Sequence, residues 1–130
     1  CNIAFAKLGF TLGNDKIYEY ANKFGYNMSI PMSLPVAQSA LPASVDTKFE
    51  LANLSTGLGK EFKVTPLLAS MMAATIANDG VMMRPYLIKE IRTIQGKVIY
   101  SEEPQKLKTA ISKAMKAGQP ARLFRPSPKF

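Results

Sequence analysis

The apolar positions of residues 64–80 predict one helix with almost no polar side. Thr65 can cap its first turn, and Pro66 stands at the first helical position, where its missing N–H is not needed. The Asn-Asp-Gly run at residues 78–80 favours a helix end with a left-handed glycine. A helix with so little polar surface is normally packed on several sides, so we expect it inside a larger core. Its apolar residues are Leu67, Leu68, Met71, Met72, Ala73, Ala74, Ile76 and Ala77.

The periodic segments before it predict a chain of the α+β class that is mostly helical. A first helix is expected from the start of the chain to about Leu12. A second is expected after Asn14, which can cap it, and Gly25 would end it. Residues 26–48 carry three prolines and no period, so we expect a long loop there. A short helical turn is expected over residues 49–54.

The last part of the chain predicts a hairpin and one more helix. Tyr86–Ile94 and Lys97–Tyr100 are expected to form two strands joined around Gln95-Gly96. Their apolar residues alternate imperfectly, which favours an edge ribbon over a central strand. Lys108–Lys116 is expected to form a final amphipathic helix. We predict no structure from Gly118 onward, because that segment is basic and rich in proline.

Positive charge is concentrated at one end of the chain. The formal net charge is +8, yet residues 1–104 carry ten Lys/Arg against nine Asp/Glu, whereas residues 105–130 carry seven Lys/Arg and no acid. No aromatic interleaving or nucleic-acid motif accompanies this charge, so we expect a solvated tail and no nucleic-acid partner. The alternative is a small basic binding module whose tail engages nucleic acid or an anionic membrane surface.

The residue types present exclude several kinds of site. The chain has one cysteine and no histidine, so an internal disulfide, a His-containing metal site and a Ser-His-Asp triad are all impossible. A Cys–His nucleophile is excluded for the same reason. The G-x-G at Gly57 and Gly59 is not followed by the lysine–threonine pair of a phosphate loop. We expect no cofactor and no metal. No apolar run approaches the ~20 residues of a membrane span.

Several short motifs follow one another in a particular order. Residues 1–5 (C-N-I-A-F) are similar to the start of a helix that carries an S-x-N motif, with the serine falling just before residue 1. Residues 12–25 contain L-G, then a helix ending in F-G. Residues 55–85 contain S-x-G-x-G, V-T-P-L and I-A-N-D-G-V-M-x-x-P. Over about residues 1–113 this order resembles the transpeptidase domain of class B penicillin-binding proteins, between S-x-N and K-[TS]-G.

The resemblance implies a partial transpeptidase domain of the penicillin-binding-protein/β-lactamase-like fold over residues 1–117, followed by the tail 118–130. It also implies a substrate-binding role for Asn2, the third residue of S-x-N, whose amide would hydrogen-bond a substrate or β-lactam amide. Without the resemblance, Asn2 is an ordinary polar residue in a first helical turn.

The resemblance further implies an activity, partners and a location. Family members cross-link peptidoglycan stem peptides through an acyl-serine, and β-lactams acylate the same serine. The expected partners are the stem peptide, β-lactams and the remainder of the transpeptidase domain. The expected location is the bacterial cell envelope, at the extracytoplasmic face of the cytoplasmic membrane.

The catalytic motifs of that family are missing from the sequence. No serine is followed by lysine three residues later, and neither K-T-G nor K-S-G occurs, since Lys108-Thr109 precedes Ala110. We therefore predict no catalytic residue here. We expect an internal fragment that begins within S-x-N, ends before K-[TS]-G and is inactive alone. A helical interaction protein derived from a decayed transpeptidase is a further interpretation. Because the family pattern stops near residue 113, we expect a shifted reading frame or an artificial terminus there.

Overall fold

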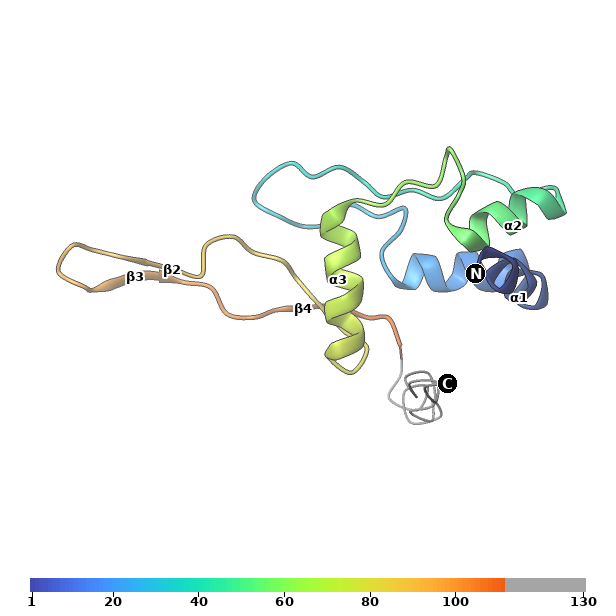
Figure 1. Ribbon diagram of the computed structural model, residues 1–130. Coiled ribbons are helices and arrows are strands. Elements are labelled where there is room, and N and C mark those ends of the chain that lie inside the picture. The colour runs from blue at the N-terminus through green and yellow to red at the C-terminus, as the bar shows by residue number, and fades with distance from the viewer. Residues whose placement is uncertain (112–130) are drawn as a thin grey trace, which may run out of the picture.

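The computed structural model describes residues 1–111, which form three helices and four short strands. The helices are α1 (Asn2–Lys23), α2 (Lys48–Thr56) and α3 (Pro66–Ala77); the strands are β1 (Val81–Met83), β2 (Glu90–Arg92), β3 (Val98–Ser101) and β4 (Lys106–Thr109). Figure 1 shows α1 and α2 packed together at one end, α3 in the middle and the β2–β3 ribbon extended at the other end. The predicted α+β, mostly helical class is confirmed.

Helix α1 contains a break that divides it in two. Gly13 has φ +76° and ψ 166°, a conformation that glycine adopts without strain, and the two helices predicted around it are confirmed. Gly25, at φ +99°, ends the second, and its N–H donates to the Asn22 carbonyl at 3.1 Å. The predicted cap at Asn14 is wrong. Its Nδ2 donates to the Val45 carbonyl at 2.7 Å, while its Oδ1 accepts no hydrogen bond, because the side chain turns toward the loop.

Helices α2 and α3 begin and end with local capping contacts. In α2, the Thr47 side chain accepts from the Glu50 N–H, and the Glu50 carboxylate accepts from the Thr47 N–H, a complete capping box. In α3, Thr65 Oγ1 accepts from the Leu68 N–H at 3.2 Å, as the sequence predicts. Gly80 follows α3 at φ +83° and donates its N–H to the Thr75 carbonyl at 2.9 Å, which confirms the left-handed end.

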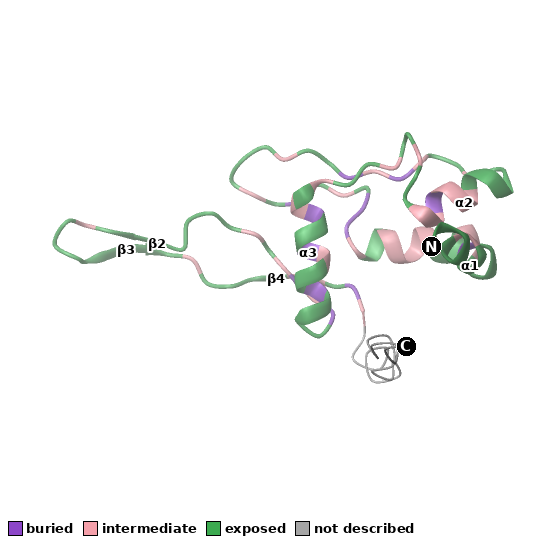
Figure 2. Ribbon diagram, in the orientation of Figure 1, coloured by how far each residue is buried: buried purple, intermediate pink, exposed green. Residues whose placement is uncertain are grey.

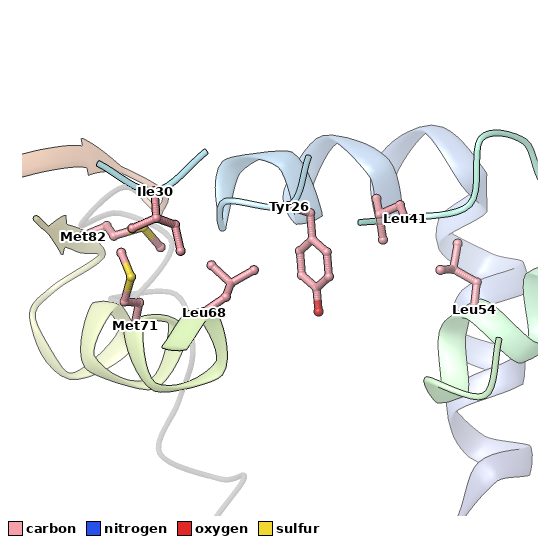
Figure 3. Close-up of a cluster of buried hydrophobic side chains, with 7 residues drawn as sticks. All are labelled: Tyr26, Ile30, Leu41, Leu54, Leu68, Met71 and Met82. Carbon is pink, nitrogen blue, oxygen red and sulfur yellow. The ribbon is translucent and has the colours of Figure 1, made fainter. Parts of the chain in front are cut away.

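A narrow line of buried apolar side chains connects α3 to the other two helices. Figure 3 shows the line running from Met82 and Met71, past Leu68 and Tyr26, to Leu54 on α2. Leu68 and Met82 are its most deeply buried members, at 0% and 1% exposure. The seven residues are Tyr26, Ile30, Leu41, Leu54, Leu68, Met71 and Met82. The core of residues 1–111 is therefore a thin seam, formed by these seven side chains and the partly buried residues packed against them.

Helix α3 is covered on one side only within residues 1–111. Leu68, Met71 and Thr75 are its buried residues, whereas Ile76 is 57% exposed. Figure 2 shows bands of buried and exposed residues alternating along this helix. The expectation that α3 is packed on several sides is thus not met by this part of the chain. The reason is that β1 and the loop around Ile30 reach one face, while its other faces lie open.

The strands form two separate antiparallel pairs. The predicted hairpin is confirmed as β2 and β3, with Ile91 opposite Tyr100 and Gly96 at φ +86° in the turn. The first strand is shorter than predicted, and the second is shifted by one residue. The predicted helix over Lys108–Lys116 is wrong at its start, because residues 106–109 form β4 and pair with β1. The rest of that predicted helix lies outside the described residues, as does the tail 118–130.

Candidate functional site

Asn2 lies in the first turn of α1, where its side chain is exposed. Cys1 is the N-cap residue, and its carbonyl accepts from the N–H groups of Ala4 at 3.1 Å and Phe5 at 3.4 Å. The turn is therefore held by backbone hydrogen bonds, and the Asn2 amide projects from a helix start. A carboxamide offers two N–H donors and one acceptor oxygen at a short reach, which suits a planar amide of a bound peptide.

The first half of α1 is held against α2 by a close approach at Gly9. Gly9 is buried, and a Cβ built on it would lie 1.8 Å from Ser55 Oγ and 2.6 Å from Ser55 Cβ. Any larger residue would push the two helices apart, so glycine sets their separation. Ser55 Oγ in turn donates to the Leu51 carbonyl at 2.6 Å. This contact fixes the direction in which α1 carries Asn2.

The second half of α1 is tied to the long loop by two side-chain hydrogen bonds. Asn14 Nδ2 donates to the Val45 carbonyl and Tyr18 Oη donates to the Pro42 carbonyl, both at 2.7 Å. Burial raises the pKa of Tyr18, with smaller contributions from the charges of Asp46 and Glu61. The phenol therefore stays protonated as a donor across the ordinary pH range. These two hydrogen bonds hold the loop segment around residues 42–45 against the second half of α1.

Lys108 on β4 reaches the C-terminal end of α1. Its Nζ donates to the Asn22 carbonyl at 2.8 Å and lies 3.2 Å from Met28 Sδ. A cation at this place satisfies a free carbonyl and complements the helix dipole. Burial lowers the pKa of Lys108 below its ordinary value of 10.5. Sequence reasoning missed this contact, although the alternating K-L-K-T run, typical of a strand, could have indicated β4.

A cavity of about 690 Å³ lies between the loop, α2 and the turn that follows α2. Pro42, Val45 and Leu58 give it apolar walls, and Glu50 and Glu61 stand among its polar residues. Hydrogen bonds from the backbone of Asp46 and Thr47, and from the Thr47 hydroxyl, lower the pKa of Glu50. Glu50 is therefore engaged as a cap. Asn2 is not among the lining residues, so the structure does not bring the predicted site residue and this cavity together.

Three further features of the described residues bear on function: possible metal ligands, the cysteine and the length and hydropathy of the helices. Within residues 1–111 there is no group of three or more His, Cys, Asp or Glu that could hold a metal ion. Cys1 is an exposed free thiol. In the same residues, no helix is both long enough and apolar enough to cross a membrane. Asn2 thus presents an exposed amide next to Cys1 in the sequence, and no serine of the chain stands in an S-x-x-K motif.

Comparison with known proteins gives a consistent picture. Residues 1–119 match the family model described as the penicillin binding protein transpeptidase domain. The chain is 37% identical over 113 residues to the peptidoglycan D,D-transpeptidase PbpA of Mycolicibacterium smegmatis, covering 86% of this chain and 23% of that protein. It therefore spans about a quarter of the length of this relative.

Solved structures show the same similarity in three dimensions. The penicillin G acyl-enzyme complex of penicillin-binding protein A from M. tuberculosis matches with a TM-score of 0.78 and 33% identity, covering 90% of this chain and 27% of the other. The D,D-transpeptidase domain of a peptidoglycan glycosyltransferase from Eggerthella lenta matches with a TM-score of 0.69 and 31% identity, covering 87% and 31%.

Proposed function

The chain belongs to the penicillin-binding protein transpeptidase domain family, and from this membership we propose that it supplies one wall of a peptidoglycan D,D-transpeptidase site. The observation that carries the proposal is the placement of Asn2. It stands exposed at the start of α1, whose first half is held against α2 by the close approach of Gly9 to Ser55. That is the geometry a positioning residue needs, because a rigid helix holds the amide still.

Asn2 would act by orienting the peptide, while the chemistry takes place on groups outside this sequence. Its carbonyl oxygen would accept from a backbone-like N–H of the stem peptide, and its Nδ2 would donate to a neighbouring carbonyl. A β-lactam carries a similar side-chain amide and would use the same contact. The nucleophilic serine, its activating lysine and the K-[TS]-G strand would come from the remainder of the transpeptidase domain, since none of these motifs occurs here.

The apolar surfaces left open by residues 1–111 support a domain larger than this chain. Ile3, Phe5 and Leu8 on α1 are 67%, 56% and 53% exposed, and Ile76 on α3 is 57% exposed. Large apolar side chains that stand exposed on one helix, as on α1, often mark a surface that another part of a protein covers. We propose that the remainder of the transpeptidase domain covers them. The complete protein would work at the extracytoplasmic face of the cytoplasmic membrane, in cell-wall synthesis during growth or division.

The absence of an S-x-x-K motif from the sequence gives a direct test. We expect that a fluorescent penicillin incubated with the 130-residue chain leaves no covalent label. M. tuberculosis penicillin-binding protein A, which forms a penicillin G acyl-enzyme, serves as the positive control. Stoichiometric labelling of this chain that survives denaturation would contradict the proposal, because it would require acylation of a residue outside any S-x-x-K motif.

A further inference from the structure

The sequence of β2 and its flanks is symmetric about its centre. Residues 88–94 read I-K-E-I-R-T-I, so isoleucines stand at the centre and at both ends, with an acid and a base equally spaced from the centre. Ile88, Ile91 and Ile94 are 55%, 41% and 103% exposed. Figure 2 shows the ribbon exposed along most of its length, away from the helices. Such a strand can pair with itself in antiparallel orientation.

The hydrogen bonds within the hairpin decide which backbone groups of β2 face outward. The Lys89 carbonyl accepts from the Glu102 N–H at 2.8 Å, and the Thr93 N–H donates to the Lys97 carbonyl at 2.9 Å. The extra residue at the register shift falls in β3, so β2 itself alternates regularly. Glu90 and Arg92 therefore turn their backbone groups to the outer edge, which pairs with no other strand of residues 1–111.

We propose that this outer edge of β2 pairs with the same edge of a second copy of the chain, about a two-fold axis at Ile91. Glu90 then lies opposite Arg92 of the second copy, and Arg92 lies opposite its Glu90. Both are outward-facing positions, so their backbones form the hydrogen-bonded pairs of an antiparallel ladder. Ile91 meets Ile91 at the centre as the pair without hydrogen bonds. The pairing is confined to β2 itself, because Ile94 already lies in the turn of the hairpin.

Charge complementarity favours a second copy of the chain as the partner of β2, and it also favours the register with the axis at Ile91. Within one chain, Arg92 Nε already contacts the Glu90 carboxylate, so the two side chains share one face of the strand. Moving the axis to Glu90 would place two carboxylates opposite each other, and moving it to Arg92 would place two guanidinium groups together. Like charges directly opposite are destabilising, whereas the axis at Ile91 makes two opposite-charge pairs. An isologous contact repeats each favourable pair, as a two-fold dimer requires.

Exchange of the two charges tests the proposal without removing buried atoms. Sedimentation equilibrium of the 130-residue chain should show a monomer–dimer equilibrium. Each single variant, Glu90→Arg or Arg92→Glu, should raise the dimer dissociation constant about tenfold or more. An equimolar mixture of the two variants should dimerise again, as should the double variant, because both restore opposite pairs. Lys97→Glu, a charge reversal on the other arm of the hairpin, should leave the dimer dissociation constant unchanged.

Cysteine cross-linking tests the position of the axis. In a Cys1→Ser background, Ile91→Cys should form a disulfide-linked dimer on mild oxidation, because Cα atoms of such a pair lie about 4.5 Å apart. Ile99→Cys, at a position on β3 that is 62% exposed, should not. The proposal is overturned if the chain stays monomeric, if charge reversal leaves dimerisation unchanged, or if both cysteines cross-link equally. A dimer insensitive to residues 90 and 92 would instead point to the apolar face of α1.

Discussion

Gly9 sets how closely α1 approaches α2, so a single methyl group added there should disturb the packing of the two helices. Alanine favours a helix over glycine by about 1 kcal/mol. At Gly9 the added Cβ meets Ser55 Oγ at 1.8 Å, and overpacking typically costs about 1–3 kcal/mol. We expect Gly9→Ala to lower the hydrogen-exchange protection of α1 and α2 amides.

Ser55, the residue that Gly9 contacts, provides the control for Gly9→Ala. In a Ser55→Gly background the nearest remaining atom is Ile17 Cδ1 at 3.8 Å, an ordinary contact. There, Gly9→Ala should raise protection, because only the gain in helix propensity remains. The same sign of effect in both backgrounds would show that the contact with Ser55 does not limit the approach of the helices.

Ser39 is the buried polar residue that holds the start of α3. It is 2% exposed, and its Oγ accepts from the Thr65 N–H at 2.9 Å and lies 3.1 Å from Thr65 Oγ1. Ser39→Ala leaves that N–H without its partner, which costs about 1–3 kcal/mol for a buried group. We expect earlier thermal loss of α3 amide protection. Ser70→Ala should stay within about 0.5 kcal/mol, because that side chain is exposed.

Helix α1 carries a surface ion network whose effect depends on pH. Hydrogen bonds from Lys16 and Lys23 lower the pKa of Glu19 from 4.5 to about 2. Because the folded pKa is lower than the unfolded one, the stabilisation is fully present above about pH 4.5 and is lost as pH falls toward 2. We expect the α1 helix signal in circular dichroism to decline across this window, and modestly, since all three side chains are exposed.

The Glu19→Gln variant isolates this contribution from that of other carboxylates. Its helix signal should change less than the wild-type signal between pH 4.5 and 2, and the two curves should converge at the acidic end. Identical curves across the window would mean that the ion pairs add nothing to the stability of α1.

Local chemistry explains which elements the sequence predicts and which it does not. The breaks at Gly13 and Gly25 and the caps at Thr65 and Gly80 depend on neighbouring residues, so they are visible in the sequence. Strand β4 depends on pairing with β1, about 25 residues away, which overrides the helical pattern around Lys108. The hydrogen bond from the Asn14 side chain to the Val45 carbonyl likewise joins residues that are far apart in the sequence. The substrate-binding role predicted for Asn2 depends on the family motif, because no local pattern singles this residue out.

At the scale of the whole molecule, residues 1–111 combine a thin core with wide open apolar surfaces. The seam in Figure 3 reaches one face of α3, while Ile76 on α3 and Ile3, Phe5 and Leu8 on α1 stay exposed. Cooperative unfolding requires elements that share one core. We therefore expect the chain alone to melt over a broad range and to bind a hydrophobic dye strongly before melting. A sharp transition that coincides by near- and far-ultraviolet circular dichroism would show that the chain folds by itself.

We propose that this chain provides the Asn2 wall of a transpeptidase site, and that the acylated serine lies outside its sequence. The most direct measurement is penicillin acylation of a chimera, in which residues 1–111 replace the matching segment of M. tuberculosis penicillin-binding protein A. We predict that the chimera is acylated. Asn2→Ala should slow its acylation about tenfold, the effect of one lost hydrogen bond of about 1.4 kcal/mol, and Lys7→Ala should not. Acylation of the Asn2→Ala chimera at the unaltered rate would contradict a substrate-positioning role for Asn2.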